Sequence, residues 1–194
     1  MIRSKQEYIN YLNQDAKALG ITRIPSFKQR IISVIAPNHI WKFQKVLRKV
    51  EYYKNCKKGF INTIVFAYLK LKHRNLGIKL GFSIPENIFG PGLAIVHYGT
   101  IVINSNVKVG ANCRIHACTN IGASGGSSKA PILGDNVYIG PGAKIYGNIS
   151  IGNNSAIGAN ATVHKSFEEN NIMIAGNPAK RIKEIDIRKI IQHI

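Results

Sequence analysis

The chain has 194 residues, of which 27 are lysine or arginine and 9 are aspartate or glutamate, so its formal net charge at pH 7 is +18. This length supports one substantial hydrophobic core with at most a small appended unit, and the charge favours anionic partners. The three cysteines, Cys56, Cys113 and Cys118, are too few for a disulfide framework and lack the CxxC spacing of a zinc site.

The positive charge is concentrated in the first 80 residues, which hold 17 basic and 3 acidic side chains, against 10 and 6 in residues 81–194. The N-terminus lacks the apolar core of a signal peptide, and the longest apolar run before residue 80 is INTIVFAY. A membrane-spanning helix needs about 20 apolar residues. We therefore expect a cytoplasmic protein with a basic N-terminal region.

Residues 1–80 are predicted to be helical. Ser4 and Glu7 have the spacing of a capping box and precede an amphipathic pattern. Two further helices are expected within 39–56 and 61–76, and Pro25 and Pro37 separate the helical segments.

From residue 101 the sequence repeats with a period of six. The third residue of each hexapeptide is aliphatic, at Ile103, Val109, Ile115, Ile121, Leu133, Ile139, Ile145, Ile151, Ile157 and Val163. The spacer GGSSKAPI interrupts the repeat without breaking its register. Three short strands joined by tight turns make one triangular coil of about 18 residues, whose aliphatic residues point to the axis, and stacked coils bury a continuous column.

The repeat predicts a mainly β protein with a parallel β-helix over residues 81–176, preceded by the basic helical region 1–80. Residues 177–194 form a tail, in which KEIDIRKIIQHI is expected to be a C-terminal helix. Cys113 falls in a column of small packing residues, so we interpret it as part of the core rather than as a nucleophile.

Four motifs, HYGTIVI, NIGASGG, IGPGAKIYGNI and IAGNPAKRI, resemble those of the hexapeptide-repeat acyltransferases. The similar group is related to serine O-acetyltransferase and includes capsule and exopolysaccharide O-acetyltransferases. The resemblance spans roughly residues 82–185. It implies a left-handed β-helix, a homotrimer, acetyl-CoA as the acyl donor, and active sites in the clefts between subunits.

The sequence departs from the serine acetyltransferases at three positions. Their DHxTG motif corresponds to residues 96–100, where Val96 replaces the acidic residue. An upstream aspartate corresponds to Phe82, and a second histidine to Ala130. These groups help to recognise serine or support the base, so their loss makes serine a poor fit, because a zwitterion needs polar partners in a buried site.

We therefore expect an acetyl-CoA-dependent O-acetyltransferase that acts on a carbohydrate hydroxyl in surface polysaccharide synthesis. One alternative is serine O-acetyltransferase of cysteine biosynthesis. Another, from a different class of function, is a catalytically silent β-helix scaffold.

O-acetylation needs a base that takes a proton from the attacking hydroxyl, and a neutral histidine suits this role near pH 7. His97 precedes Ile103 by one hexapeptide, which predicts that it lies on the aliphatic column. It is either a structural histidine of the first coil or, as the resemblance implies, the general base. His116 and Tyr98 are expected to be neighbours on adjacent coils. Each is either an acceptor-binding residue or a solvated corner residue.

The donor site is implied mostly by the resemblance. The backbone around Gly122, Ala143 and Ala159 is expected beside the pantetheine arm, since small residues allow close approach. Lys180 and Arg181 are expected to meet the phosphates of acetyl-CoA, with an ordinary solvated basic pair as the alternative. No metal ion is required.

The basic N-terminal region has three interpretations. It attracts an anionic acceptor such as a nucleotide- or lipid-diphosphate-linked sugar, it rests on the anionic inner face of a membrane, or it is a solvated surface. Nucleic acid is not an expected partner, because the basic residues are not interleaved with aromatic ones as in strand-binding proteins.

Overall fold

The computed structural model describes residues 1–21 and 35–194, so Pro25 lies outside the described residues. The helices are α1 (Lys5–Ala18), α3 (His39–Cys56) and α4 (Phe60–Leu80). The predicted cap of the first helix is confirmed, because the Glu7 backbone N–H donates to Ser4 Oγ at 3.1 Å. In the same turn the Glu7 carboxylate accepts from the Arg3 backbone N–H at 2.6 Å.

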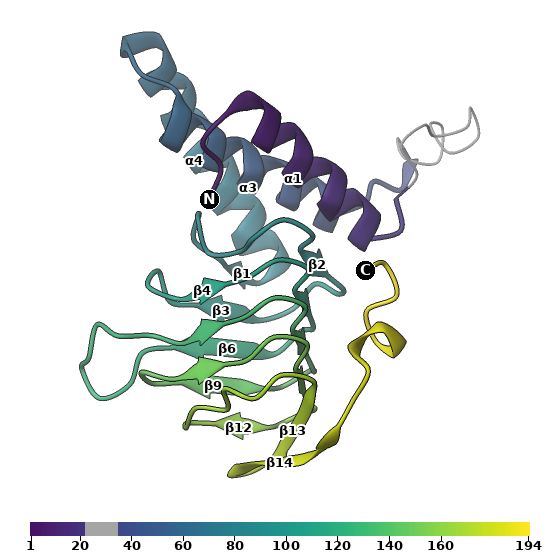
Figure 1. Ribbon diagram of the computed structural model, residues 1–194. Coiled ribbons are helices and arrows are strands. Elements are labelled where there is room, and N and C mark those ends of the chain that lie inside the picture. The colour runs from purple at the N-terminus through teal and green to yellow at the C-terminus, as the bar shows by residue number, and fades with distance from the viewer. Residues whose placement is uncertain (22–34) are drawn as a thin grey trace.

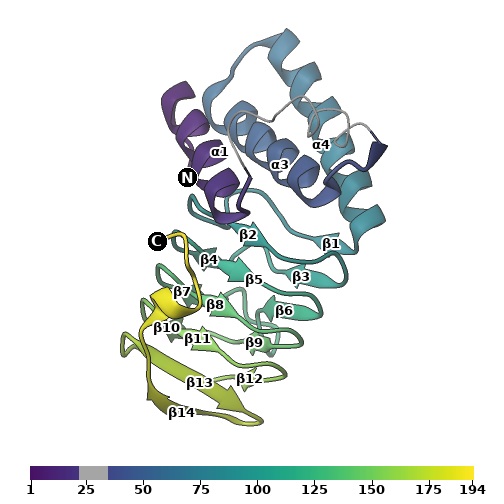
Figure 2. The same cartoon turned by 90° about the vertical axis from the view of Figure 1, so that its right-hand side faces the viewer.

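A triangular prism of short, mostly parallel strands lies below the helices in both views (Figures 1 and 2). One face holds the sheet β1-β3-β6-β9-β12, a second β10-β7-β4, and the third β14-β13-β11-β8-β5-β2. The strands of the upper coils are β1 (Phe82–Ser83), β2 (Ala94–Ile95), β3 (Ile101–Ile103), β4 (Lys108–Val109), β5 (Arg114–Ile115), β6 (Thr119–Gly122) and β7 (Ile132–Leu133). Those of the lower coils are β8 (Tyr138–Ile139), β9 (Lys144–Tyr146), β10 (Ser150–Ile151), β11 (Ala156–Ile157), β12 (Thr162–Val163), β13 (Ile172–Gly176) and β14 (Ala179–Glu184).

The interior of the prism is the predicted aliphatic column. All ten aliphatic residues of the repeat are buried and belong to one hydrophobic cluster. Ile139 pairs with Ile157, one coil of 18 residues later, whereas Ile121 pairs with Ile145 because the spacer loop lengthens that coil. The loop projects sideways from the prism (Figure 1). Cys113 is buried in this core, and burial raises the pKa of its thiol, as expected for a packing residue.

The first coil is longer than the repeat, and this overturns the predicted position of His97. Ile95, not His97, is the buried residue that pairs with Ile115 on the next coil. Ile95 and Ile103 are eight residues apart, two more than one hexapeptide. The segment 96–99 therefore projects at a corner of the prism, and the His97 side chain is exposed. Counting by six from Ile103 therefore placed His97 wrongly on the column.

The predicted C-terminal helix is also wrong. Residues Ala179–Glu184 form β14, which runs antiparallel to β13, and only Ile187–Lys189 form a turn of 3-10 helix. The backbone of this segment is satisfied by pairing with β13. Beyond it, Ile187 and Ile191 pack on the outer face of the prism at Tyr138 and Ala156. Packing of Ile187 and Ile191 on the sheet takes the place of helix formation.

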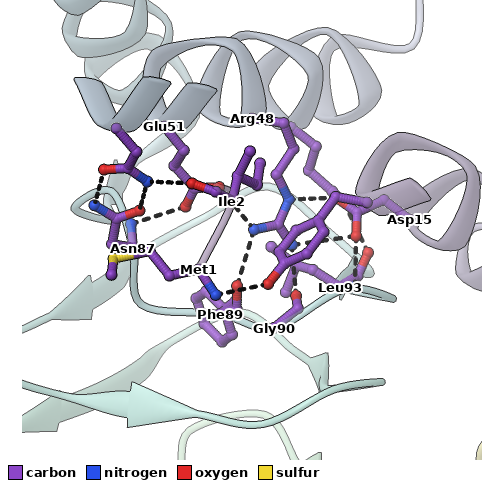
Figure 3. Close-up of polar contacts among 12 residues, drawn as sticks. Met1, Ile2, Asp15, Arg48, Glu51, Asn87, Phe89, Gly90 and Leu93 are labelled. Carbon is purple, nitrogen blue, oxygen red and sulfur yellow. Dashed lines mark hydrogen bonds and ion pairs between the residues drawn. The ribbon is translucent and has the colours of Figure 1, made fainter. Parts of the chain in front are cut away.

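A buried polar network fastens the helices to the first coil (Figure 3). Arg48 of α3 pairs with Asp15 of α1 at 2.8 Å and with Glu51 at 3.0 Å. The same guanidinium donates to the carbonyl oxygens of Phe89 and Gly90 at 2.9 and 2.7 Å. The helical region and the prism are therefore joined by directional contacts as well as by the shared apolar core.

Candidate active site

His97 and His116 come together at one corner of the upper prism. His97 follows β2, and His116 follows β5 on the next coil, with ring centroids 6.1 Å apart. His116 also packs against Tyr138 of β8, with centroids 5.1 Å apart. The neighbour of His116 is thus His97 rather than Tyr98, because the longer first coil shifts the register that we predicted. Tyr98 is 72 % exposed.

His116 has the properties of a neutral polar group beside the exposed histidine. Burial lowers the pKa of His116, and the positive charges of Arg114 and His97 lower it further. Its Nε2 atom is buried and has no hydrogen-bond partner among residues 1–21 and 35–194. A buried, unsatisfied ring nitrogen is costly in an isolated chain, so it is available to bind a ligand at this corner.

The segment that carries His97 is held from above by Gln44 of α3. The Gln44 amide donates to the carbonyl oxygen of Leu93 at 2.7 Å, and its oxygen accepts from the Ile95 backbone N–H at 3.4 Å. Gln44 is fully buried. Gln44 was not identified from the sequence as a residue that supports this segment. Its one signal in the sequence is a polar residue next to the apolar Phe43 within the helix over 39–56.

Two positions that depart from the serine acetyltransferase pattern are packing positions. Phe82 is buried and meets Phe43 edge-on, with ring centroids 5.1 Å apart. Ala130 is buried in the same hydrophobic cluster at the base of the spacer loop. Val96, beside His97, is half-buried and brings no charge to the imidazole. None of these three positions supplies a polar group to an acceptor.

The expected donor residues do not form one group within this chain. Gly122 ends β6 on one face, whereas Ala159 follows β11 on another and is exposed. A Cβ atom at Gly122 would touch only the Asn120 Oδ1 atom, at 3.4 Å, so its backbone is open to close approach. The Ala143 side chain is fully buried in the prism, so this residue can present only its backbone.

Lys180 and Arg181 lie on β14, at the end of the prism opposite the histidines (Figure 1). Both side chains are exposed, and Arg181 Nε pairs with Glu169 Oε2 at 2.9 Å. Five strand spacings of about 4.8 Å separate β14 from β2 in the shared sheet. The two cations can therefore meet only the distal end of a long ligand whose other end reaches His97.

Within the described part of the chain, no three or more His, Cys, Asp or Glu side chains are grouped so that they could hold a metal ion. Over the same residues, no helix is both long and apolar enough to cross a membrane.

Comparisons with known proteins agree with this architecture. Residues 130–165 match the family described as bacterial transferase hexapeptide (six repeats). The chain is 36 % identical over 125 residues to a serine acetyltransferase of Buchnera aphidicola, which covers 61 % of this chain and 46 % of that protein. It is 37 % identical over 92 residues to a serine acetyltransferase of Mycobacterium tuberculosis, covering 46 % of this chain and 40 % of the relative. The chain thus spans less than half the length of these relatives.

The structural comparison covers more of the chain. The crystal structure of serine acetyltransferase from Brucella abortus strain S19 superimposes with a TM-score of 0.68 and 26 % identity, over 94 % of this chain and 72 % of that one. A structure of the same enzyme in complex with coenzyme A matches with 27 % identity and the same TM-score of 0.68, over 94 % of this chain and 70 % of that one.

The fold and the repeat define a left-handed β-helix of hexapeptide type with N-terminal helices. Within that class, the chain is similar to the hexapeptide-repeat acyltransferases of the group related to serine acetyltransferase.

The expectation of a carbohydrate acceptor and a role in polysaccharide synthesis is wrong. The matched relatives and the matched structures are serine acetyltransferases, which favours the alternative of a serine O-acetyltransferase. The departures at three positions had argued against serine. Two of them, Phe82 and Ala130, are filled by buried core side chains in this chain.

Proposed function

We propose that the protein is a serine O-acetyltransferase, which transfers the acetyl group of acetyl-CoA to the hydroxyl of L-serine in the cytoplasm. The observation that carries this proposal is the exposed His97 beside His116 at the corner of a prism related to serine acetyltransferases. Residues 81–176 form the acyltransferase unit, with 1–80 as its basic helical region and 177–194 as its tail.

In this mechanism the neutral imidazole of His97 accepts the proton of the serine hydroxyl as its oxygen attacks the thioester carbonyl carbon. The C–S bond then breaks, and the thiolate of CoA takes up the proton held by His97, which restores the neutral imidazole. General-base assistance of this kind typically contributes about 10²- to 10⁴-fold to the rate. His116, which is neutral near pH 7 because its pKa is lowered, lines the acceptor side.

Acetyl-CoA supplies the activated acetyl group, and this chain supplies surfaces for it. The open backbone at Gly122 and the exposed Ala159 each allow close approach of a pantetheine arm, and because they lie on different faces of one chain they would border the same arm from neighbouring subunits. Lys180 and Arg181 at the far end of the prism are suited to its phosphates.

The active unit is proposed to be a homotrimer with sites between subunits. Two observations support this. His97 is exposed in the single chain, and a direct transfer needs a site that excludes water. Ile132 and Tyr98 project from the prism with 56 % and 72 % of their surface exposed, which suits contact with a second chain. Light scattering on the purified protein measures the mass directly.

The test of the function is an acceptor assay. Purified protein receives acetyl-CoA with and without L-serine, and release of free thiol is followed together with the mass of O-acetylserine. Serine-dependent thiol release in step with product supports the proposal. Thiol release that is unchanged by serine, or none at all, refutes it.

A membrane contact is proposed for the helical region, on a separate observation. One side of α4, here called the α4 stripe, is apolar and more than half exposed at Phe60, Ile61, Ile64, Tyr68, Leu71 and Ile78. The helix contains no acidic residue, and Lys72 and Lys79 flank the stripe, with Lys42 of α3 beside them. An apolar stripe with basic flanks is typical of a helix that lies on an anionic bilayer. Two copies of this stripe would bring like charges together, which disfavours self-association.

Sedimentation with phosphatidylcholine vesicles, with and without phosphatidylglycerol, tests this contact. Binding is expected only with the anionic lipid, and it should be lost in Ile64→Glu but kept in Ile9→Glu, a matched change on α1. Binding that is equal in both variants, or a concentration-dependent dimer that Ile64→Glu abolishes, contradicts the proposal.

A further inference from the structure

A cavity of about 530 Å³ lies beside the segment that carries His97. It is open to solvent and is bordered by the end of α1, the outer surface of the sheet at β2 and β5, and the C-terminal tail. In both overall views the C-terminus lies below α1 and next to the upper coils (Figures 1 and 2). Lys17, Val96, Arg114, Gln192 and His193 are among its lining residues.

Among the described residues that line this cavity, the charged side chains, Lys17 and Arg114, are both positive. Lys17 and Arg114 line it together with His193, and none of the described lining residues is acidic. Neither Lys17 nor Arg114 takes part in an ion pair among residues 1–21 and 35–194. Two cations in one concave surface repel each other, and an anion placed between them removes that cost.

His193 adds a polar atom without a partner. Its Nε2 atom is buried and has no hydrogen-bond partner within the described residues. Burial lowers the pKa of His193, and the positive charges of Lys17 and Arg114 lower it further, so the three groups act on one another. A ring N–H at this atom can donate to an oxygen ligand, and the nearby cations strengthen the attraction to an anionic one.

We propose that this cavity binds an organic oxyanion, a carboxylate or a phosphate ester, through Arg114, Lys17 and His193. A volume of about 530 Å³ is in the usual range for a ligand site and leaves room for more than the charged group alone. The anion has two sources, the carboxylate of the acceptor itself or a separate effector. The first source rests on the proposed function, whereas the second is independent of it.

The cavity is electrostatically connected to the histidine corner. Val96, which lines it, directly precedes His97. Arg114 lies next to Ala94 and Tyr138 in the sheet, and its charge also acts on His116. An anion held by Arg114 offsets that charge, so the two sites are coupled through a single guanidinium.

Direct binding tests the proposal without any turnover. Inorganic phosphate and citrate are titrated into the full chain by calorimetry at constant ionic strength, with chloride as the background anion. We expect saturable binding that weakens at least about tenfold in Arg114→Gln, which corresponds to the loss of a charge-assisted hydrogen bond. Lys17→Gln, on the exposed end of α1, is a second variant in case Arg114→Gln does not fold. Lys129→Gln in the spacer loop is the matched control and should bind as the parent does.

Kinetics then separate the two sources. If citrate or phosphate competes with L-serine, and Arg114→Gln raises KM for serine but not for serinamide, the site takes the carboxylate of the acceptor. If inhibition is not competitive with serine, the site belongs to a separate anion. Binding without any serine turnover supports the site and refutes only the proposed function. Absence of saturable binding, or equal binding in the parent and in both charge variants, overturns the inference.

Discussion

The rings of His97 and His116 lie 6.1 Å apart on successive coils of the prism, one exposed and the other half-buried. The second histidine packs on Tyr138, so its position is fixed by the sheet beneath it. The pair therefore combines an accessible imidazole with a neighbouring imidazole that is held in place.

Replacing His116 with alanine should lower kcat/KM for serine about 3- to 10-fold, the value of one lost hydrogen bond. The effect should appear mainly in KM, because we propose that His116 lines the acceptor side. His164 is the matched control. It occupies the same repeat position farther along the prism and stacks on Tyr146 at 6.1 Å, so His164→Ala removes a similar contact without touching the site. Equal kinetic losses in the two variants would assign His116 a structural role.

The buried pair between Asp15 and Arg48 should dominate the attachment of the helices to the prism. Both side chains are inaccessible to solvent, and Arg48→Met leaves the Asp15 carboxylate without its cation. We expect the free energy of unfolding to fall by about 3–5 kcal/mol in urea denaturation. Lys54→Met is the control, since Lys70 still pairs with Glu86 at 2.7 Å, and it should change stability by less than about 1 kcal/mol.

Stability should fall between pH 7 and pH 5 because of His73. Burial lowers the pKa of this histidine to about 4, with Lys70 as the second cause, whereas its ordinary value is 6.5. Between pH 6.5 and pH 4 the unfolded chain binds a proton at His73 that the folded chain does not bind. The free energy of unfolding is therefore fully retained above pH 6.5 and decreases progressively as the pH falls towards 4. The loss between pH 7 and pH 5 is up to about 2 kcal/mol.

Urea denaturation of the parent and of His73→Phe at the two pH values isolates this contribution. Phenylalanine keeps the stacking on Phe43, whose ring centroid lies 4.8 Å from that of His73, and it does not titrate. The variant should lose the largest single part of the pH dependence between pH 7 and pH 5, whereas His116 and His193, whose pKa values burial also lowers, still contribute. Glu86, whose pKa is lowered to about 2 from 4.5, contributes only at more acidic pH. An unchanged slope in the variant would show that other groups carry the effect.

Tight stacking of the coils should make Gly140 intolerant of a side chain. A Cβ atom there would lie 2.7 Å from the Ala159 backbone nitrogen and 2.9 Å from the Gly158 carbonyl carbon. Gly140→Ala should therefore destabilise the prism by about 1–3 kcal/mol, as overpacking does. At Gly122 a Cβ atom has room, so Gly122→Ala should unfold at nearly the same temperature as the parent. Thermal unfolding of the two variants compares these positions.

The prism could be predicted from the sequence because its order is local and periodic. Each hexapeptide places one aliphatic residue on the axis, and all ten positions from Ile103 to Val163 are buried as the count required. The helix over 39–56 likewise follows from a local apolar pattern. Counting by hexapeptides gives the wrong position in the first coil, because this coil holds two additional residues before β3. Nothing in the local sequence marks these two residues.

The rest depends on contacts between distant segments. Asp15 and Arg48 belong to different helices, and the Arg48 guanidinium also binds carbonyl oxygens of the first coil. The tail was predicted to be helical, but pairing of β14 with β13 and packing of Ile187 on Tyr138 determine its conformation. The cavity lined by Lys17, Arg114 and His193 is built from three segments, α1, the first coils and the tail. No single sequence motif therefore marks it.

The most direct test of the account is the turnover of His97→Ala with acetyl-CoA and L-serine, compared with His39→Gln, an exposed histidine on α3. If His97 is the general base, His97→Ala should lose at least about 100-fold in kcat while keeping the oligomeric mass and melting temperature of the parent. His39→Gln should retain normal turnover. Near-normal turnover in folded His97→Ala would contradict the assignment of this histidine and with it the proposed active site.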